Sequence, residues 1–303
     1  MQHITLGTRG SPLALAQAQL TLDALRLAAP ATAVTVLPFT TSGDRASAVR
    51  LAKQTPAGAK GLFTKELEDA LLRGKIDLAV HSCKDLPGQM PEGLTLAALL
   101  ERAATADLLL TKAPGELPPG AHVGTSSVRR ARQLRFRRPD LGIEEIRGNV
   151  ATRLRKLRES ATLHGIVLAQ AGLNRLGYRL ENGVLQTGEG TFFVQDAGML
   201  PAIGQGAIAL QCRAADAPFF APLNHTPTAL AIRAERELMR LLDGDCTLPV
   251  GVATEPAPGG GQRMRVLLFG APDAPPRQAD VTAATPEALA AEAFRALMDS
   301  KEF

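Results

Sequence analysis

Runs of β-branched and apolar residues alternate along most of the chain with segments whose apolar residues recur at helical spacing. The runs have the length of strands, and the segments between them have the pattern of amphipathic helices. This alternation is typical of an α/β protein with mixed, mainly parallel sheets. The pattern predicts helices from Pro12 and over 64–73, and strands over 4–8, 34–38, 76–80, 107–111, 122–124, 143–147 and 165–169.

The pattern changes along the chain in a way that indicates three domains. Shifts near residues 101–107 and 194–198 bracket a middle block and have the form of paired crossings between domains. Beyond residue 217 we expect a small α+β module, with a helix over 228–242, a strand pair around the loop 256–261 and a closing helix over 286–298. The expected boundaries are 1–100 with 197–216 for a discontinuous domain 1, 101–196 for domain 2 and 217–303 for domain 3.

The composition is that of a globular protein. Of 303 residues, 45% are hydrophobic and 21% charged, and the apolar runs are far shorter than the roughly 20 residues of a membrane-spanning helix. The N-terminal segment lacks the pattern of a signal peptide, so we expect a cytoplasmic protein. Three scattered cysteines, Cys83, Cys212 and Cys246, form no disulfide framework or C-x-x-C pair, and no metal site is expected.

Positive charge is concentrated in one block. Between residues 126 and 160, ten arginines and Lys156 stand against four acidic residues, a net charge of +7, although the whole chain carries only +4. The planar guanidinium group matches carboxylates and phosphates in a way that a lysine ammonium does not. The block is therefore suited to bind anions, and a solvated basic face is the alternative that the count leaves open.

Three predicted strand ends run directly into helix starts that carry arginine. They lie in 8–12, 124–130 and 147–153. A cation at a helix N-terminus interacts unfavourably with the helix dipole. The repeated placement of arginine there is explained if a bound anion lies between the arginine and the free N–H groups of the helix. In open α/β sheets ligands bind at the carboxyl ends of strands, where all three segments fall. Capping alone is the alternative, and the expected N-caps are Ser11, Ser127 and Thr152.

Asp85 lies in the segment 81–87, which follows the strand predicted over 76–80, and it is the only carboxylate among these strand-end clusters. A carboxylate among cations can stabilise a cationic intermediate or move protons. A turn aspartate before Leu86 and proline is the alternative interpretation. We expect His81 to be a structural histidine.

Cys246 occupies a turn after the helix predicted over 228–242, unlike most structural cysteines, which are buried. The flanking Asp243 and Asp245 disfavour a thiolate, and hence a thiol nucleophile that attacks an acyl group. They argue less against a permanent tether formed once with a very reactive electrophile.

Seven short segments, each weakly informative alone, become specific through their order. They are Thr8-Arg9-Gly10-Ser11-Pro12-Leu13-Ala14, Lys60-Gly61-Leu62-Phe63, His81 to Pro87, Gly124 to Arg130, Arg147-Gly148-Asn149 with Thr152-Arg153, Ala171 to Gly177, and the Cys246 turn. Together, between residues 4 and 251, they resemble the porphobilinogen deaminase family, also called hydroxymethylbilane synthases.

The resemblance implies two lobes similar to periplasmic binding proteins and a small third domain that carries a cofactor cysteine. It implies a transferase of tetrapyrrole and haem biosynthesis that condenses four porphobilinogen molecules head to tail, releases four ammonia molecules and forms linear hydroxymethylbilane. The growing chain is attached to a dipyrromethane cofactor, held by a thioether that by position falls on Cys246. A monomer with a small-molecule substrate is expected, without nucleic-acid or membrane partners.

Carried over segment by segment, the resemblance gives candidate site residues. Asp85 is the expected catalytic residue, near the pyrrole nitrogens, where it assists loss of ammonia and stabilises the azafulvene cation. Phe63 is expected to pack near the incoming ring, with a lid over 44–61. The expected binders of substrate and cofactor carboxylates are Arg9, Ser11, Lys84, Arg129, Arg130, Arg147, Arg153 and Arg175, with further donors from Thr125, Ser126 and Ser127. Arg132, Arg135, Arg137 and Arg138 match no functional motif and are expected to form a solvated helix face.

Two functions of other classes compete with this one. A non-catalytic anion-binding protein on the same two-lobed fold would form no covalent adduct, and it would need a secretion signal or a DNA-binding module, of which we find neither. Nucleic-acid binding by the basic block is the second, and the net charge of +4 and the 4% of aromatic residues weigh against it.

Overall fold

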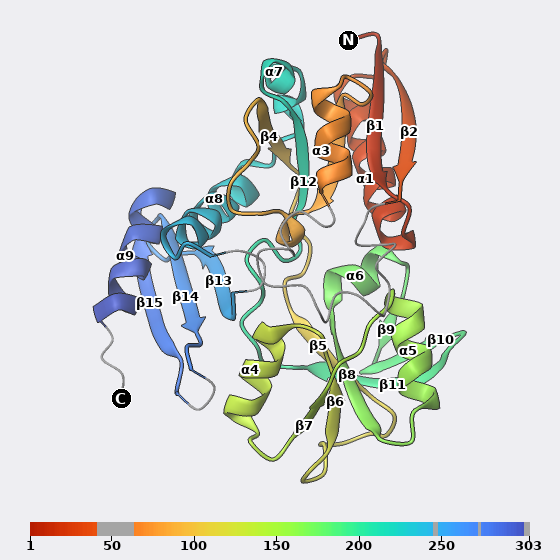
Figure 1. Cartoon of the computed structure of the whole chain (residues 1–303), viewed down its shortest axis with the longest axis vertical. Helices are drawn as coiled ribbons and strands as arrows, with labels where there is room; N and C mark the ends of the chain where they lie inside the picture. The colour runs from red at the N-terminus through yellow and green to blue at the C-terminus, as the bar shows by residue number, and fades with distance from the viewer. Residues whose placement is uncertain (41–63, 245–247, 272–273, 300–303) are drawn as a thin grey trace. The chain divides into compact units, whose positions relative to one another are not determined.

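The computed structural model describes residues 1–40, 64–244, 248–271 and 274–299. The chain divides into two compact units, whose elements are labelled in Figure 1. Unit 1 comprises Met1–Ala103 and Gly204–Cys246, and unit 2 comprises Ala104–Ile203 and Thr247–Phe303. Each unit is therefore assembled from two separate stretches of the chain.

The sheet of unit 1 is formed by β1 (His3–Arg9), β2 (Ala33–Phe39), β3 (Leu78–Ser82), β4 (Leu94–Leu99) and β12 (Ile208–Arg213). Its order is β2-β1-β3-β12-β4. Strand β1 pairs in parallel with β2 and β3, whereas β12 is antiparallel to both β3 and β4. Among the described strands of this sheet, therefore, only β12 runs against the others.

Helices α1 (Pro12–Ala28) and α3 (Lys65–Leu72) cover opposite faces of this sheet. Side chains alternate between the two faces along a strand. In β3, Val80 belongs to the core cluster that contains Leu25 of α1, and Ala79 belongs to the cluster that contains Leu71 of α3. The other described helices of unit 1 are the short η3 (Cys83–Asp85), η4 (Ala214–Asp216), α7 (Ala217–Phe220) and η5 (Ala221–Leu223), and the longer α8 (Thr226–Leu241).

The larger sheet of unit 2 is formed by β5 (Asp107–Thr111), β6 (His122–Gly124), β7 (Gly142–Glu144), β8 (Leu163–Ala169), β9 (Leu180–Glu181), β10 (Val184–Thr187) and β11 (Gly190–Asp196). Its order is β7-β6-β8-β5-β11-β10-β9. Strand β6 is parallel to β7 and β8, and the remaining neighbours pair antiparallel. Of the strands described here, β5 and β10 oppose the direction of the others.

Helices α4 (Val128–Arg137), α5 (Val150–Glu159) and α6 (Gln170–Arg175) cover this sheet. Leu110 of β5 packs in one core cluster with Leu154 of α5 and Leu173 of α6, while the adjacent Leu109 packs in another with Leu134 of α4. Because neighbouring strand residues face opposite ways, α4 lies on one face and α5 and α6 lie on the other.

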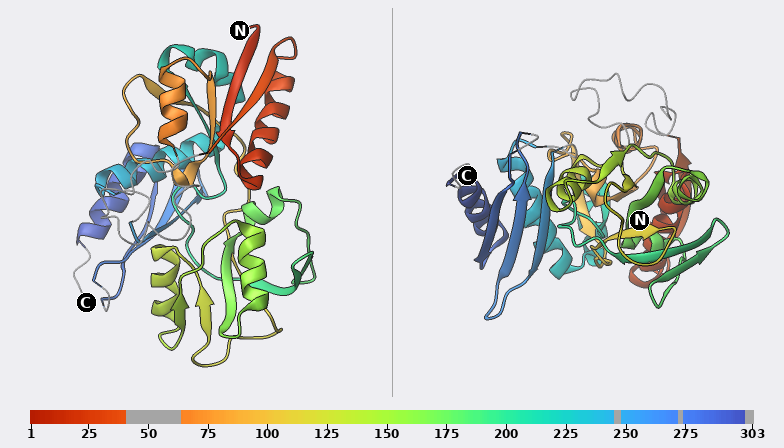
Figure 2. Two further views of the ribbon diagram at one scale, coloured as in Figure 1. Left: turned by 45° about the vertical axis from the view of Figure 1, so that its right-hand side comes forward. Right: turned by 90° about the horizontal axis from the view of Figure 1, so that it is seen from below.

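A second, antiparallel sheet in unit 2 follows the order β13-β14-β15, and α9 packs against it (Figure 2). The elements are β13 (Val250–Pro256), β14 (Gln262–Leu268), β15 (Arg277–Ala283) and α9 (Pro286–Asp299). The strand pair and the closing helix agree with the sequence prediction. The third strand, β15, was not predicted.

The predicted α/β class with mixed sheets is confirmed, since strands and helices form layered units and two of the sheets contain parallel pairs. Antiparallel pairs nevertheless outnumber parallel ones among the described strands. The strands predicted over 107–111 and 122–124 have the predicted bounds as β5 and β6, whereas the one predicted over 143–147 ends at Glu144. The three-domain division stays a prediction. In the described part of the chain, no helix combines the length and apolar character that a membrane span requires.

Candidate active site

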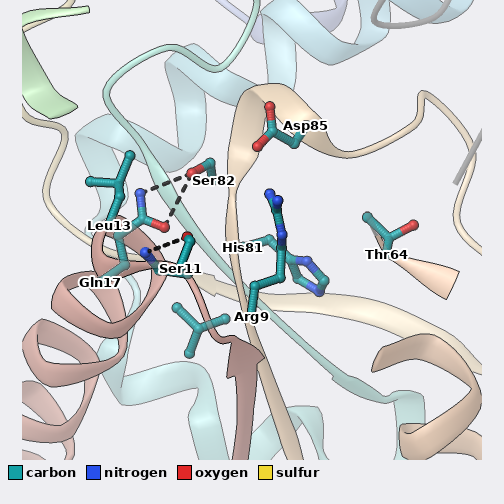
Figure 3. Close-up of a pocket in the computed structure, with 10 residues that line it drawn as sticks. Arg9, Ser11, Leu13, Gln17, Thr64, His81, Ser82 and Asp85 are labelled. Carbon is teal, nitrogen blue, oxygen red and sulfur yellow. Dashed lines mark hydrogen bonds between the residues drawn. The ribbon is translucent and has the colours of Figure 1, made fainter. Parts of the chain in front are cut away.

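Unit 1 contains a cavity at the carboxyl ends of β1 and β3, close to the start of α1 (Figure 3). Ligands bind at this edge of open α/β sheets. Arg9, Ser11 and Asp85, three of the predicted site residues, are among the side chains that line it. The others are Leu13, Ala14, Gln17, Thr64, Val80, His81 and Ser82.

Ser11 caps helix α1, as predicted. Its hydroxyl accepts a hydrogen bond from the Ala14 N–H at 3.3 Å, and Pro12 occupies the first helical position, where its missing N–H costs nothing. Arg9, the last residue of β1, is half-buried in the same wall. Strand end and helix start thus bring one cation and one hydroxyl to the cavity.

Asp85 ends the short helix η3, which follows β3 directly. The next residue, Leu86, is 1% exposed, and its N–H donates to the Cys83 carbonyl at 3.1 Å. This buried anchor fixes the turn, so that the Asp85 carboxylate lines the cavity, while Lys84 lies half-buried beside it in the chain.

Gln17 and Ser82 line the cavity but were missed by the sequence analysis. Each donates to the other, the Gln17 amide to the Ser82 hydroxyl at 2.9 Å and the hydroxyl back to the amide oxygen at 3.1 Å. Gln17 is 3% exposed and lies among Ala14, Ala18 and Leu25 on the buried face of α1. A buried polar side chain needs a hydrogen-bonding partner. The position of Gln17 within this apolar stripe was therefore the feature of the sequence that could have identified it.

In unit 2, the segment after β6 carries three hydroxyls. The Ser127 hydroxyl accepts from the Arg130 N–H at 3.4 Å and caps α4, as predicted. Thr125 is buried and its hydroxyl accepts from the Ser127 N–H at 3.1 Å, whereas the exposed Ser126 donates to the Ile146 carbonyl at 2.6 Å. These hydroxyls are therefore held in place by the backbone around them.

Arg129 and Arg130 are both buried against Asp107, the first residue of β5. The Arg129 Nη2 lies 2.7 Å from one carboxylate oxygen of Asp107 and the Arg130 Nη2 lies 2.7 Å from the other. Arg129 also donates to the Leu200 carbonyl and Arg130 to the Val167 carbonyl. Asp107 is thus a carboxylate beside the predicted arginines that the sequence segments themselves did not contain, because β5, antiparallel to β8, begins at the same edge of the sheet.

Arg147 and Arg153 lie on the next strand-to-helix connection, after β7. Arg147 Nε donates to the Glu145 carboxylate at 2.6 Å, and Arg153 Nε donates to the Gly148 carbonyl at 2.8 Å. Helix α5 is capped by Asn149, whose side chain accepts from the Thr152 N–H at 2.9 Å. The predicted Thr152 cap is wrong, because the helix begins at Val150, before that threonine.

Arg153 lies in a concentration of positive charge. Burial lowers the pKa of its guanidinium, and the charges of Arg130 and Arg147 lower it further. Within the described residues it forms no ion pair with a carboxylate. Arg175, at the end of α6 after β8, is likewise half-buried, and burial lowers its pKa to about 10. Buried guanidinium charge at this sheet edge favours an anionic ligand.

The family comparison agrees with this edge-of-sheet chemistry. The family model described as "Porphobilinogen deaminase, dipyromethane cofactor binding domain" matches residues 4–220. The chain belongs to the porphobilinogen deaminase family. The predicted family and its dipyrromethane-binding domain are thereby confirmed.

Curated relatives named porphobilinogen deaminase resemble the chain over most of its length. The protein of Syntrophobacter fumaroxidans is 46% identical over 254 residues, which are 82% of this chain and 78% of that protein. The chloroplastic porphobilinogen deaminase of Oryza sativa is 42% identical over 275 residues, 88% of this chain and 74% of that protein. Among solved structures, a methionine-binding protein aligns with 78% of this chain and 91% of its own at 12% identity and a TM-score of 0.41, too distant to inform fold or ligand.

The guanidinium side chains at the sheet edge of unit 2 fit the dipyrromethane of a porphobilinogen deaminase. Each of its pyrroles carries acetate and propionate groups, and guanidinium groups bind carboxylates with two parallel hydrogen bonds. The observation that supports the fit is that half-buried Arg153 forms no ion pair with a carboxylate among the described residues and that the charges of Arg130 and Arg147 act on it.

Two predictions concern residues outside the described ranges, namely the attachment at Cys246 and the position of Phe63 with its lid over 44–61. The other two cysteines, Cys83 and Cys212, are buried, and burial raises the pKa of each to about 11. Neither is a reactive thiol.

Of the four arginines expected to form a solvated helix face, Arg135 and Arg137 are exposed and Arg132 and Arg138 are half-buried. Arg132 donates to the carbonyls of Gly270 and Ala271, and Arg137 donates to those of Ala197 and Gly198. Arg138 forms an ion pair with Asp140, 2.8 Å apart, while Arg135 is exposed as expected. Except for Arg135, these arginines bind backbone or carboxylate groups, which the sequence pattern could not reveal.

Proposed function

We propose that this chain condenses four porphobilinogen molecules head to tail, releases four molecules of ammonia and forms linear hydroxymethylbilane on a dipyrromethane joined by a thioether to Cys246. The observation that carries the proposal is the cavity of unit 1, where Asp85 shares a wall with Arg9 and Ser11. A carboxylate next to carboxylate-binding groups suits a substrate that is acidic at its side chains and becomes cationic at its ring.

Asp85 is the proposed catalytic residue. When the aminomethyl group of porphobilinogen leaves as ammonia, positive charge develops on the pyrrole and its methylene carbon. The Asp85 carboxylate stabilises that charge and then accepts the proton that the ring loses after the new C–C bond forms. Arg9, Ser11 and Lys84 bind the acetate and propionate groups and so orient the ring.

The arginines of unit 2 are proposed to bind carboxylates of the cofactor and the lengthening product. Arg147, Arg153 and Arg175 supply guanidinium groups at the sheet edge, and Thr125, Ser126 and Ser127 add hydroxyl and backbone donors. When bound, the dipyrromethane supplies a pyrrole ring for C–C bond formation. Because Arg129 and Arg130 are held by Asp107, they contribute fixed positive charge and their remaining N–H groups.

The remaining expectations are proposed with this function. The protein acts in the cytoplasm as a monomer and does not bind nucleic acid. Its three domains have the predicted boundaries: domain 1 carries Arg9, Ser11 and Asp85, domain 2 carries the arginines between residues 129 and 175, and domain 3 carries Cys246. Phe63 packs against the incoming ring. The absence of a disulfide framework in the sequence supports the cytoplasmic assignment.

The function is tested by incubating the purified protein with porphobilinogen and measuring ammonia and hydroxymethylbilane together. We expect four ammonia molecules for each tetrapyrrole. Saturable binding of porphobilinogen without release of ammonia would favour the anion-binding alternative instead.

Arg153→Gln is expected to lower kcat/KM for porphobilinogen by about 10- to 100-fold, because a charge-assisted hydrogen bond contributes about 1.5–3 kcal/mol. The matched control is Arg155→Gln, an exposed arginine on the same helix, which should change kcat/KM little. Steady-state kinetics of both variants measure the loss of kcat/KM, and thermal unfolding shows whether either variant is destabilised. Similar losses of activity in the two would remove Arg153 from the binding site.

A further inference from the structure

His81 and Gln211 form a buried hydrogen bond beneath the cavity of Asp85. They lie on the neighbouring antiparallel strands β3 and β12, where His81 is opposite Ala209 and Gln211 is opposite Ala79. This diagonal register puts both side chains on the same face of the sheet, the face covered by α3. His81 Nε2 lies 3.0 Å from the Gln211 amide oxygen, and the two residues are 5% and 0% exposed.

The surroundings of Gln211 fix which way its amide points. The amide nitrogen lies 3.4 Å from a Glu68 carboxyl oxygen and 3.4 Å from the Met90 sulfur. Both partners accept hydrogen bonds, which only the NH₂ end of an amide can donate. The amide oxygen must therefore face His81, and an oxygen there can only accept. It follows that His81 Nε2 carries the proton and that Nδ1 keeps its lone pair.

The charge around His81 keeps its ring neutral. Burial lowers the pKa of His81 to about 4, the hydrogen bond to Gln211 opposes this shift, and the positive charge of Arg9 adds to it. The other charged groups that approach from neighbouring elements are Asp85 of η3, in the same cavity wall, and Glu68 of α3, beyond Gln211. Since the pKa lies below its ordinary value, the ring is uncharged throughout the physiological range.

We propose that Gln211 is a positioning residue that holds His81 as the uncharged Nε2–H tautomer in the wall of the Asp85 cavity. His81 lines the same cavity as Arg9 and Asp85, and its unprotonated Nδ1 makes the ring an uncharged hydrogen-bond acceptor there. An N–H donor suits such an acceptor, and porphobilinogen has both a pyrrole N–H and an aminomethyl group. This last step rests on the proposed function, whereas the tautomer does not.

The tautomer and protonation of His81 are measured by ¹⁵N NMR of the histidine-labelled holoenzyme between pH 5.5 and 8, with the signal assigned through His81→Gln. We expect the Nε2–H form in wild type and no titration over this range. Gln211→Glu places a carboxylate on Nε2 and should raise the His81 pKa by about 1–3 pH units. Gln133→Glu is the matched control, since Gln133 is another buried glutamine, bonded to the Leu200 backbone in unit 2, and it should leave the His81 signal unchanged.

Activity gives a second, separable readout. In Gln211→Glu the pH profile of kcat/KM should gain an acid limb at the raised His81 pKa, falling about tenfold per pH unit below it, whereas Gln133→Glu should lack it. A protein that fails to turn over porphobilinogen would refute the proposed function and leave the NMR result standing. An Nδ1–H tautomer, titration of wild-type His81 near its ordinary pKa, or an unchanged His81 pKa in Gln211→Glu would overturn the positioning role.

Discussion

Asp85→Asn is expected to lower kcat by about 10²–10⁴-fold, the range that a positioned acid–base group contributes. The amide is close in size to the carboxylate, so it should keep its place at the end of η3, where Leu86 anchors the turn. It can neither accept a proton nor offset the positive charge on the ring. Steady-state kinetics with porphobilinogen, together with circular dichroism and thermal unfolding, measure the effect.

The control for this variant is Glu92→Gln, which neutralises an exposed carboxylate in the same unit. It should retain wild-type kcat. If Asp85→Asn turned over within tenfold of wild type, Asp85 would not be the catalytic residue, and another group would have to stabilise the ring cation.

Asp107→Asn is expected to lower the free energy of unfolding by about 3–5 kcal/mol, because removing one partner leaves buried charge uncompensated. Asp107 is fully buried, and its two oxygens face Arg129 and Arg130, whose side chains are 6% and 8% exposed. An asparagine cannot neutralise two guanidinium groups. Denaturant unfolding followed by far-UV circular dichroism measures the loss.

Asp140→Asn is the matched control, because it breaks the pair between Asp140 and Arg138, two side chains that are 38% and 37% exposed. Exposed ion pairs contribute little to stability, so this variant should unfold almost as wild type does. Equal losses of unfolding free energy in Asp107→Asn and Asp140→Asn would show that the buried ion pairs of Asp107 stabilise the fold no more than an exposed pair does.

Features set by local sequence could be predicted. Ser11 and Ser127 are caps because a hydroxyl three residues before a free N–H can reach it whatever the rest of the chain does. The strand at 107–111 follows from its apolar run, and Asp85 from its place after the strand that precedes it. The prediction of Thr152 as an N-cap was wrong because Asn149, three residues earlier, is an equally good cap and directly precedes the helix.

Features set by tertiary contacts could not be predicted. Asp107 meets Arg130 across 23 residues of chain, and His81 meets Gln211 across 130, so neither pair leaves a local pattern. The same is true of Arg132, which donates to the carbonyls of residues 270 and 271. The arginines at the predicted strand-to-helix junctions indicated that anions bind at the sheet edge. Which other groups these arginines contact depends on strands that the fold brings beside them.

The covalent tether is tested most directly by the intact mass of the purified protein. We expect wild type to be heavier than its sequence by one dipyrromethane, and Cys246→Ala to have the unmodified mass and no turnover. Cys212→Ala, a change at a buried cysteine of β12, should keep the added mass. A wild-type protein with the mass of its bare sequence that still converts porphobilinogen to hydroxymethylbilane would contradict attachment at Cys246.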